Sequence, residues 1–310
     1  MLEPAPIVEL KDDPTPEGLQ AFWFDASDGI RLRAAISPAR GKPQGSVFFS
    51  SGRSEYIEKY FELIREMNER GLTVAIIDHR GQGLSDRLLA NPLLGHVGNF
   101  SDYAKDMETL WGLIENQMPE PRFLVAHSMG GAIAADLARR GNIQFSKMLA
   151  CAPMLGFAGD SPVLKFAVWA LSKLWLKKKT PTRATSSSAL DPKNAEVLTS
   201  NKTRFGYHMQ RITLEPKLQL AGPTFGWLQA AINLYKSLAG STGYEKITIP
   251  VYYAIAGKEA LVSNRAISQA CQILPNAKCT VFEGALHEIF QERDEHRNRF
   301  MQDLFEFLEV

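Results

Sequence analysis

Six short apolar runs, most of them separated by segments with helical spacing, constrain the fold of this chain more than any other feature. The runs are rich in β-branched and aromatic residues and do not alternate polar with apolar positions, which is typical of strands buried on both faces of a parallel sheet. They cover residues 46–50, 72–78, 122–127, 147–152, 251–257 and 278–284. We therefore predict an α/β fold with a mostly parallel central sheet and helices on both of its faces.

Two further patterns complete the predicted core. Residues 19–36 alternate polar and apolar side chains around the turn sequence DASDG, which predicts a β-hairpin ahead of the parallel strands. The expected helices lie at residues 56–70, 101–118, 129–141, 264–273 and about 290–309. With 310 residues, the chain has the length of a single α/β core that carries an insertion.

One interval interrupts the alternation of strands and helices. Residues 155–240 contain no convincing strand, and they hold twelve lysine and arginine residues against four aspartate and glutamate residues. The interval therefore carries a net charge of +8 in a chain whose total is +1. We predict that it forms a helical cap, with residues 1–154 and 241–310 as the two parts of the α/β core around it.

Residues 164–179, within the predicted cap, place apolar side chains at helical spacing and gather lysines at one end. Two interpretations fit this pattern. The helix either makes transient contact with an anionic membrane surface, or it packs on the core as an ordinary cap helix with a solvated basic end.

The overall composition excludes several classes of protein. A net charge of +1 argues against nucleic acid as a partner. The three cysteines, Cys151, Cys271 and Cys279, have no metal-ligand spacing, and we expect free, buried thiols in a reducing compartment. The first residues lack the basic start and apolar stretch of a signal peptide, and no run approaches the roughly 18 apolar residues of a spanning helix. We expect a cytoplasmic protein, and peripheral attachment to a membrane stays open.

Ser128 stands where a predicted strand turns into a predicted helix, in the sequence AHSMGG. A side chain at such a tip projects above the carboxyl edge of the sheet, where doubly wound sheets hold ligands. The tight turn needs small neighbours, which Ala126 and Gly130 supply, and the backbone N–H of Met129 points to the same place as an oxyanion donor. This is the nucleophile-elbow pattern G-x-S-x-G with alanine at its first position. The alternative is a structural serine that caps the helix.

A serine nucleophile needs a base, and His287 is the best placed of six histidines. It follows the last predicted strand in the sequence EGALHEIF, where a loop leaves the same sheet edge. The other histidines are expected to have roles other than that of the base. His127 is structural, His79 helps to line the site, His96 orders a loop, and His208 and His296 lie at the surface.

The base in turn needs an acid that holds its tautomer, and Glu259 follows the preceding strand in the sequence AGKEALVSN. The order Ser128, Glu259, His287 is the one expected for an elbow-type fold. Glu259 could instead be a solvated loop residue, while Glu288 is expected at the surface or behind the base. The backbone N–H of Arg53, after Gly52, is the expected second oxyanion donor, unless this loop is a simple glycine turn.

Taken together, these segments resemble the α/β-hydrolase superfamily, and more narrowly its S33-type serine hydrolases of the lysophospholipase L2 and monoacylglycerol lipase group. The elbow carries the resemblance together with DHRGQGLSDR at 78–87, SGRSEYIEKYFEL at 51–63, GKEALVSN at 257–264 and GALHEIFQE at 284–292. The cap sequence GPTFGWLQAA at 222–231 also resembles the lysophospholipase branch. Three positions depart from the usual pattern: Glu259 replaces aspartate, Ser51 precedes Gly52 in place of histidine, and Ala126 opens the elbow.

The resemblance implies an enzyme that cleaves a small-molecule ester or lysolipid through an acyl-enzyme on Ser128, without a metal or an organic cofactor. Two other functions stay open. An aminopeptidase of the same superfamily would need acidic groups in the cap to hold the substrate's ammonium, and this cap has few. A non-catalytic ligand-binding protein on the same scaffold would be expected to lose a member of the catalytic set. Only the replacement of the usual aspartate by Glu259 favours this alternative.

Overall fold

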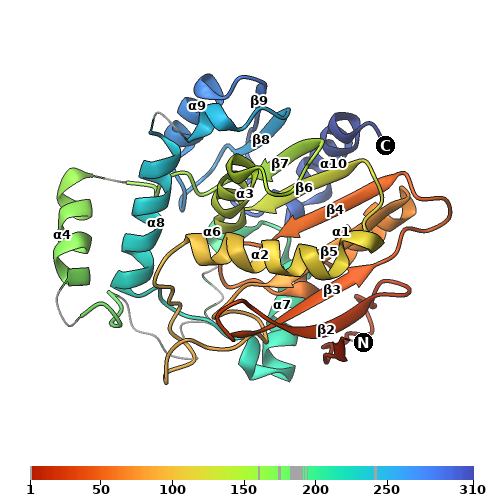
Figure 1. The fold of residues 1–310 in the computed structure, drawn as a ribbon, viewed down its shortest axis with the longest axis horizontal. Coiled ribbons are helices and arrows are strands. Elements are labelled where there is room, and N and C mark those ends of the chain that lie inside the picture. The colour runs from red at the N-terminus through yellow and green to blue at the C-terminus, as the bar shows by residue number, and fades with distance from the viewer. Residues whose placement is uncertain are drawn as a thin grey trace.

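A computed structural model gives the architecture of the chain and describes residues 2–159, 161–173, 176–181, 191, 193, 195–240 and 243–310. Nine strands of the described residues form one sheet in the order β1-β2-β3-β5-β4-β6-β7-β8-β9 (Figure 1). The strands are β1 Glu3–Pro4, β2 Gln20–Asp25, β3 Arg31–Ser37, β4 Gly45–Ser50, β5 Leu72–Asp78, β6 Arg122–His127, β7 Lys147–Cys151, β8 Val251–Ala256 and β9 Ala277–Phe282. From β5 to β9 the sheet is parallel, and β1, β2 and β3 add an antiparallel edge.

The sheet confirms the predicted fold class. Every residue of β4, β5 and β8 is buried, as expected for central strands covered on both faces. Strands β2 and β3 form the predicted hairpin, with Gln20 paired to Ile36 and Asp25 to Arg31. Strand β9 is less buried than its apolar sequence suggests, because it is the last strand of the sheet and has a neighbour on one side only.

Helices cover both faces of the sheet (Figure 1). The core helices are α1 Phe61–Glu69, α2 Ser101–Ile114, α3 Met129–Arg140, α9 Asn264–Ile273 and α10 Asp294–Leu308, with the short 3-10 turns η1 Ile57–Tyr60, η2 Glu115–Gln117, η5 Tyr244–Lys246 and η6 Ile289–Gln291. Helices α1 and α10 adjoin through the Arg297–Glu66 ion pair at 2.8 Å. On the opposite face, α2 and α3 adjoin, with Arg140 of α3 3.6 Å from Glu108 of α2.

The segment between β7 and β8 is helical in its described part. It contains α4 Pro162–Lys173, α6 Ala195–Leu198, α7 Lys202–Leu214, η4 Pro216–Leu218 and α8 Phe225–Leu238. Residues 174 and 175, which belong to the predicted amphipathic helix, lie outside the described residues. Asp13 of the N-terminal arm accepts a hydrogen bond from Arg211 of α7 at 2.8 Å and one from Arg65 of α1 at 2.7 Å. The arm thus ties the inserted helices to the core, while the cap's role as a separate unit stays a prediction.

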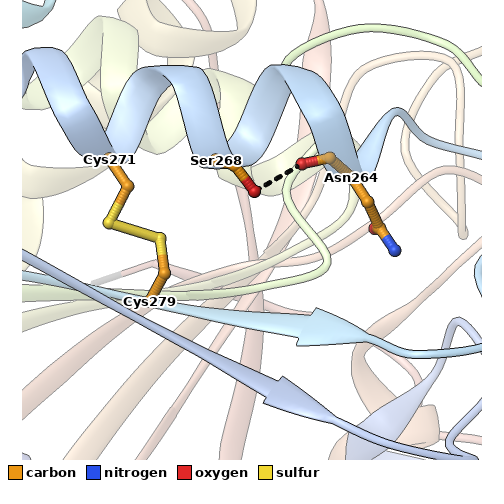
Figure 2. The surroundings of a disulfide bond; sticks show 4 residues. All are labelled: Asn264, Ser268, Cys271 and Cys279. Atoms are coloured by element: carbon orange, nitrogen blue, oxygen red, sulfur yellow. Dashed lines mark hydrogen bonds between the residues drawn. A yellow bond between two sulfur atoms is a disulfide. The ribbon is translucent and has the colours of Figure 1, made fainter.

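The cysteines correct one prediction. Cys271 and Cys279 form a disulfide between α9 and β9 (Figure 2), so the expectation of three free thiols is wrong for this pair, and Cys151 is free and buried. The spacing of the cysteines alone could not reveal the pair, because their proximity depends on the turn after α9, which brings the end of this helix beside β9. There the two Cα atoms are 6.5 Å apart, within the span of a disulfide.

Among the described helices, none is both long and apolar enough to cross a membrane.

Candidate active site

The turn between β6 and α3 holds Ser128 in an uncommon backbone conformation, with φ of 50° and ψ of −118°. The turn is locked by hydrogen bonds from the backbone N–H of Ser128 to Cys151 O at 3.0 Å and from Met154 N–H to Ser128 O at 2.9 Å. A Cβ atom at Gly130 would lie 2.0 Å from the carbonyl oxygen of Ser50, so only glycine fits there. The hydroxyl of Ser128 makes no capping hydrogen bond to α3. The capping interpretation of this serine is therefore wrong.

Three side chains from separate loops form a continuous hydrogen-bonded line. Nε2 of His287 lies 2.8 Å from Oγ of Ser128, and Nδ1 of His287 lies 2.7 Å from Oε2 of Glu259. Because a carboxylate only accepts, Nδ1 carries the proton that it donates to Glu259, and Nε2 is left to accept from the serine hydroxyl. The arrangement can pass a proton from the serine hydroxyl to the imidazole.

Both carboxylate oxygens of Glu259 accept hydrogen bonds. Oε1 accepts the backbone N–H groups of Ala260 at 2.9 Å, Leu261 at 2.7 Å and Val262 at 3.2 Å. Burial alone would raise the pKa of Glu259, but the hydrogen bond and charge of His287 and these N–H groups outweigh burial and lower the pKa. Its side chain is 1% exposed. A solvated loop glutamate is therefore excluded, and the carboxylate stays ionised beside the imidazole.

The loop after β4 carries Arg53, the predicted second oxyanion donor. Ser54 has a positive φ of 65°, and its N–H donates to Oε1 of Gln82 at 2.6 Å, while the N–H of Gly52 donates to the carboxylate of Glu55. Within the described residues, the backbone N–H groups of Arg53 and Met129 donate no hydrogen bond. Both donors are free to meet an oxyanion, and their role in the reaction stays a prediction.

A buried charge cluster behind the imidazole was not found from the sequence. Lys59 lies 3.1 Å from Oε1 of Glu55 and 2.5 Å from Oε1 of Glu288. His127 approaches Glu55 with Nδ1 at 2.9 Å and the carbonyl oxygen of His287 with Nε2 at 3.3 Å. Glu288, expected at the surface or behind the base, is buried. The i, i+4 spacing of Glu55 and Lys59 was the available signal in the sequence.

The two acceptors around His127 indicate its charge state. A carboxylate and a carbonyl oxygen can only accept, so both ring nitrogens of His127 must carry protons for both hydrogen bonds to form. Burial alone would lower the pKa of His127, but the charge of Glu55 and its hydrogen bond outweigh burial and raise the pKa. His127 therefore acts as a cation that holds the backbone of His287 in place, in line with the structural role expected for it.

His208 corrects another expectation. It lines the cavity beside Ser128 rather than the surface, because α7 folds back over the core. Its Nδ1 lies 3.0 Å from the hydroxyl of Tyr56, and burial lowers the pKa of its imidazole.

The other histidines lie away from the reacting atoms. His79 is buried with Nε2 3.0 Å from Oγ of Ser50, and it is not a cavity-lining residue among those described. His96 orders a loop, as expected, through a 2.8 Å contact with the Thr224 hydroxyl. His296 is 17% exposed and lies partly at the surface. The described residues hold no cluster of three or more histidine, cysteine or acidic side chains that could bind a metal.

A cavity of about 500 Å³ opens beside Ser128 and His287. Most of its wall is apolar and comes from the helical segment between β7 and β8. The apolar lining residues are Met154, Phe157, Val197, Leu198, Phe205, Ile212, Leu218, Leu220, Ala221, Pro223, Trp227, Leu228, Leu261 and Val262. A volume and lining of this kind suit an acyl chain or another small apolar group.

The strand order, the sharp elbow at Ser128 and the loops that meet above it define an α/β-hydrolase. A family model described as serine aminopeptidase, S33, matches residues 41–294, and the chain belongs to this family. This confirms the resemblance drawn from the sequence motifs.

Relatives and solved structures agree with the family. The chain is 30% identical over 309 residues to lysophospholipase L2 of Escherichia coli (strain K12), covering 93% of this chain and 89% of that protein. It is 27% identical to the monoacylglycerol lipase of Mycolicibacterium smegmatis, with 88% and 91% covered. A soluble variant of the Saccharomyces cerevisiae monoglyceride lipase in complex with a substrate analog superposes with a TM-score of 0.76 at 18% identity, with 98% of both chains covered. The matches indicate a carboxylic ester hydrolase of lipase type.

Proposed function

We propose that this chain hydrolyses the acyl ester of single-chain glycerolipids, lysophospholipids or monoacylglycerols, through an acyl-enzyme on Ser128. The observation that carries the proposal is the line of hydrogen bonds from Ser128 through His287 to Glu259 at the wall of an apolar cavity. The names of the relatives support this substrate class.

In the proposed reaction, the hydroxyl of Ser128 attacks the ester carbonyl while Nε2 of His287 takes its proton. Glu259 holds the imidazole in the required tautomer and stabilises the imidazolium that forms. The N–H groups of Arg53 and Met129 stabilise the oxyanion, and removal of one such donor typically costs roughly 100- to 1000-fold in rate. His287 then protonates the leaving glycerol oxygen, and water attacks the acyl-enzyme with the same base.

The test is a panel of monoacylglycerols, lysophospholipids, p-nitrophenyl esters and aminoacyl amides assayed with wild type and Ser128→Ala. We expect wild type to cleave the lipid esters, and the variant to lose at least about 1000-fold in kcat. Unchanged turnover in Ser128→Ala would eliminate the mechanism.

An aminopeptidase is disfavoured by the charges in the cavity. The lining carboxylates are Glu55 and Glu288, and both are paired with Lys59, while Glu55 is also paired with His127. Neither is left free to hold a substrate's ammonium group. Faster cleavage of aminoacyl amides than of lipid esters in the same panel would reverse this preference.

We further propose that α4 contacts an anionic membrane surface from which the substrate is taken. Val163, Phe166 and Trp169 repeat every three residues on one helix face and are 78%, 66% and 46% exposed. The other face packs on α8, where Val168 is buried. The exposed lysines 177–179 follow the helix and suit acidic lipid headgroups.

Vesicle co-sedimentation tests this contact. Wild type is expected to bind phosphatidylglycerol-containing vesicles more strongly than phosphatidylcholine vesicles. Phe166→Ala with Trp169→Ala, and charge reversal of lysines 177–179, should each reduce the bound fraction. Equal binding by wild type and both variants would favour the ordinary cap helix.

A further inference from the structure

One basic side chain of the cavity wall, that of Arg53, has no acidic partner among the described residues. The guanidinium of Arg53 donates from Nη2 to the carbonyl oxygen of Ala221 and from Nη1 to Oγ of Ser54 at 3.3 Å. Its buried Nε has no hydrogen-bond partner among the described residues, and no described carboxylate forms an ion pair with it. The lysine of the wall, Lys59, is instead neutralised by the carboxylates of Glu55 and Glu288.

The surroundings of Arg53 hold the guanidinium at the cavity wall, where the residue is half-buried. It lies over the ring of Trp227, with Cζ 5.6 Å from the ring centroid, and both Ala221 and Trp227 line the cavity. A Cβ atom at Gly95 would lie 3.0 Å from Nη2, so the absence of a side chain at residue 95 makes room for the guanidinium. Burial lowers the pKa of Arg53 to about 10, which leaves the group charged at neutral pH.

A partly desolvated cation without a counter-ion is costly, and a ligand anion that reaches it gains a charge-assisted hydrogen bond. Guanidinium groups match phosphate oxygens in geometry and are weakly hydrated, which makes arginine the usual choice for such contacts. The leaving group of a lysophospholipid carries a phosphate, whereas that of a monoacylglycerol carries hydroxyl groups alone.

We propose that the side chain of Arg53 binds the headgroup phosphate of the substrate and makes the enzyme select lysophospholipids over neutral monoacylglycerols. This inference rests on the proposed function and narrows its substrate class. It assigns the side chain of Arg53 to headgroup recognition, separately from the backbone N–H that is proposed to stabilise the oxyanion.

The experiment compares lauroyl lysophosphatidylglycerol with monolauroylglycerol, which share the acyl chain and the scissile ester. The readout is the ratio of the two kcat/KM values within each protein, so any change in the shared chemistry cancels. Arg53→Met should lower the ratio by about 10- to 100-fold, the range expected for a hydrogen bond to a charged group. Arg53→Lys keeps the positive charge but not the planar set of N–H donors of the guanidinium, so it should recover part of the ratio.

Lys217→Met is the matched control, because Lys217 is exposed and adjoins the lining residue Leu218 without lining the cavity itself. Its ratio should stay within about twofold of wild type, since exposed charges are screened. An unchanged ratio in Arg53→Met would overturn the inference. Activity on both lipids with that unchanged ratio leaves the ester hydrolase intact, whereas inactivity of the wild type on every ester refutes the proposed function itself.

A measurement on wild type keeps the inference testable if the variants do not fold. sn-Glycerol 3-phosphate should compete with monolauroylglycerol at a concentration at least tenfold lower than glycerol requires. Equal inhibition by glycerol 3-phosphate and glycerol would contradict a phosphate contact. Inhibition by inorganic phosphate as strong as that by glycerol 3-phosphate would point to a site for the free anion and contradict headgroup recognition.

Discussion

Shortening Glu259 by one methylene group tests how the site depends on the length of its acid. Oε2 lies 2.7 Å from Nδ1 of His287 and Oε1 lies 2.7 Å from the N–H nitrogen of Leu261, so the carboxylate is held from both sides. Loss of one carbon–carbon bond, about 1.5 Å, leaves one of these partners about 4 Å away, beyond hydrogen-bond distance. We expect Glu259→Asp to lower kcat by roughly 10- to 100-fold, although aspartate is the usual residue in similar hydrolases.

Glu259→Gln keeps the length but changes the chemistry. Both carboxylate oxygens accept hydrogen bonds, and an amide has a single acceptor, so its NH₂ group must face either His287 or the backbone N–H groups. The imidazole then loses its tautomer or its position, and kcat should fall by about 1000- to 10,000-fold. KM should change little, because Glu259 is not among the described lining residues of the cavity.

The assay is the initial rate of p-nitrophenyl butyrate hydrolysis between pH 6 and 9, with kcat and KM fitted separately. Glu283→Asp is the control, since Glu283 is exposed in the loop that leads to His287. Wild-type kcat in Glu259→Asp, or a loss of less than tenfold in Glu259→Gln, would refute the proposed role of this carboxylate.

Three further predictions concern stability. Gly130→Ala should lower the free energy of unfolding by at least about 2 kcal/mol or prevent folding, since its Cβ would lie 2.0 Å from the Ser50 carbonyl oxygen; an unchanged urea midpoint contradicts this. Burial lowers the pKa of His79 to about 3, so between about pH 6.5 and 3 the unfolded chain binds a proton at this residue and the folded protein does not. The free energy of unfolding should therefore fall as the pH decreases from about 6.5 toward 3, by up to about 1.4 kcal/mol per pH unit. His79→Asn should reduce this slope in urea titrations, and an identical slope argues against the neutral buried imidazole. Cys271→Ser should cost about 2–3 kcal/mol, because the bond to Cys279 closes a loop with a separation of eight residues; a change below about 1 kcal/mol means that this bond contributes little.

Strands β2 to β9, the core helices and the residues of the Ser-His-Glu triad could be predicted because each depends on a local pattern, whereas the two-residue strand β1 was not predicted. Ser128, Glu259 and His287 each follow an apolar run, and the carboxyl ends of parallel strands meet at one edge of the sheet. The topology therefore brings them together without any knowledge of side-chain contacts. The elbow adds its own local requirement for small residues such as Gly130.

The rest depends on contacts between distant segments that no local pattern records. Arg33 bridges Glu58 and Asp78 with all three side chains fully buried, and the sequence shows only a charged residue in a hairpin strand. His208 was placed at the surface because the direction in which α7 crosses the core is set by tertiary packing. The sequence also could not show that the Arg53 guanidinium has no carboxylate partner among the described residues, since this requires knowledge of the neighbours of the side chain.

Reaction with a fluorophosphonate probe tests the central claim most directly, because the probe labels a serine hydroxyl only when a neighbouring base activates it. Intact-mass and peptide analysis of the wild type should find one adduct, on Ser128, with none in Ser128→Ala and labelling at least about 1000-fold slower in His287→Ala. No adduct on the folded wild type would instead favour a ligand-binding protein on a hydrolase scaffold. Labelling that persists in Ser128→Ala would contradict the assignment of the nucleophile.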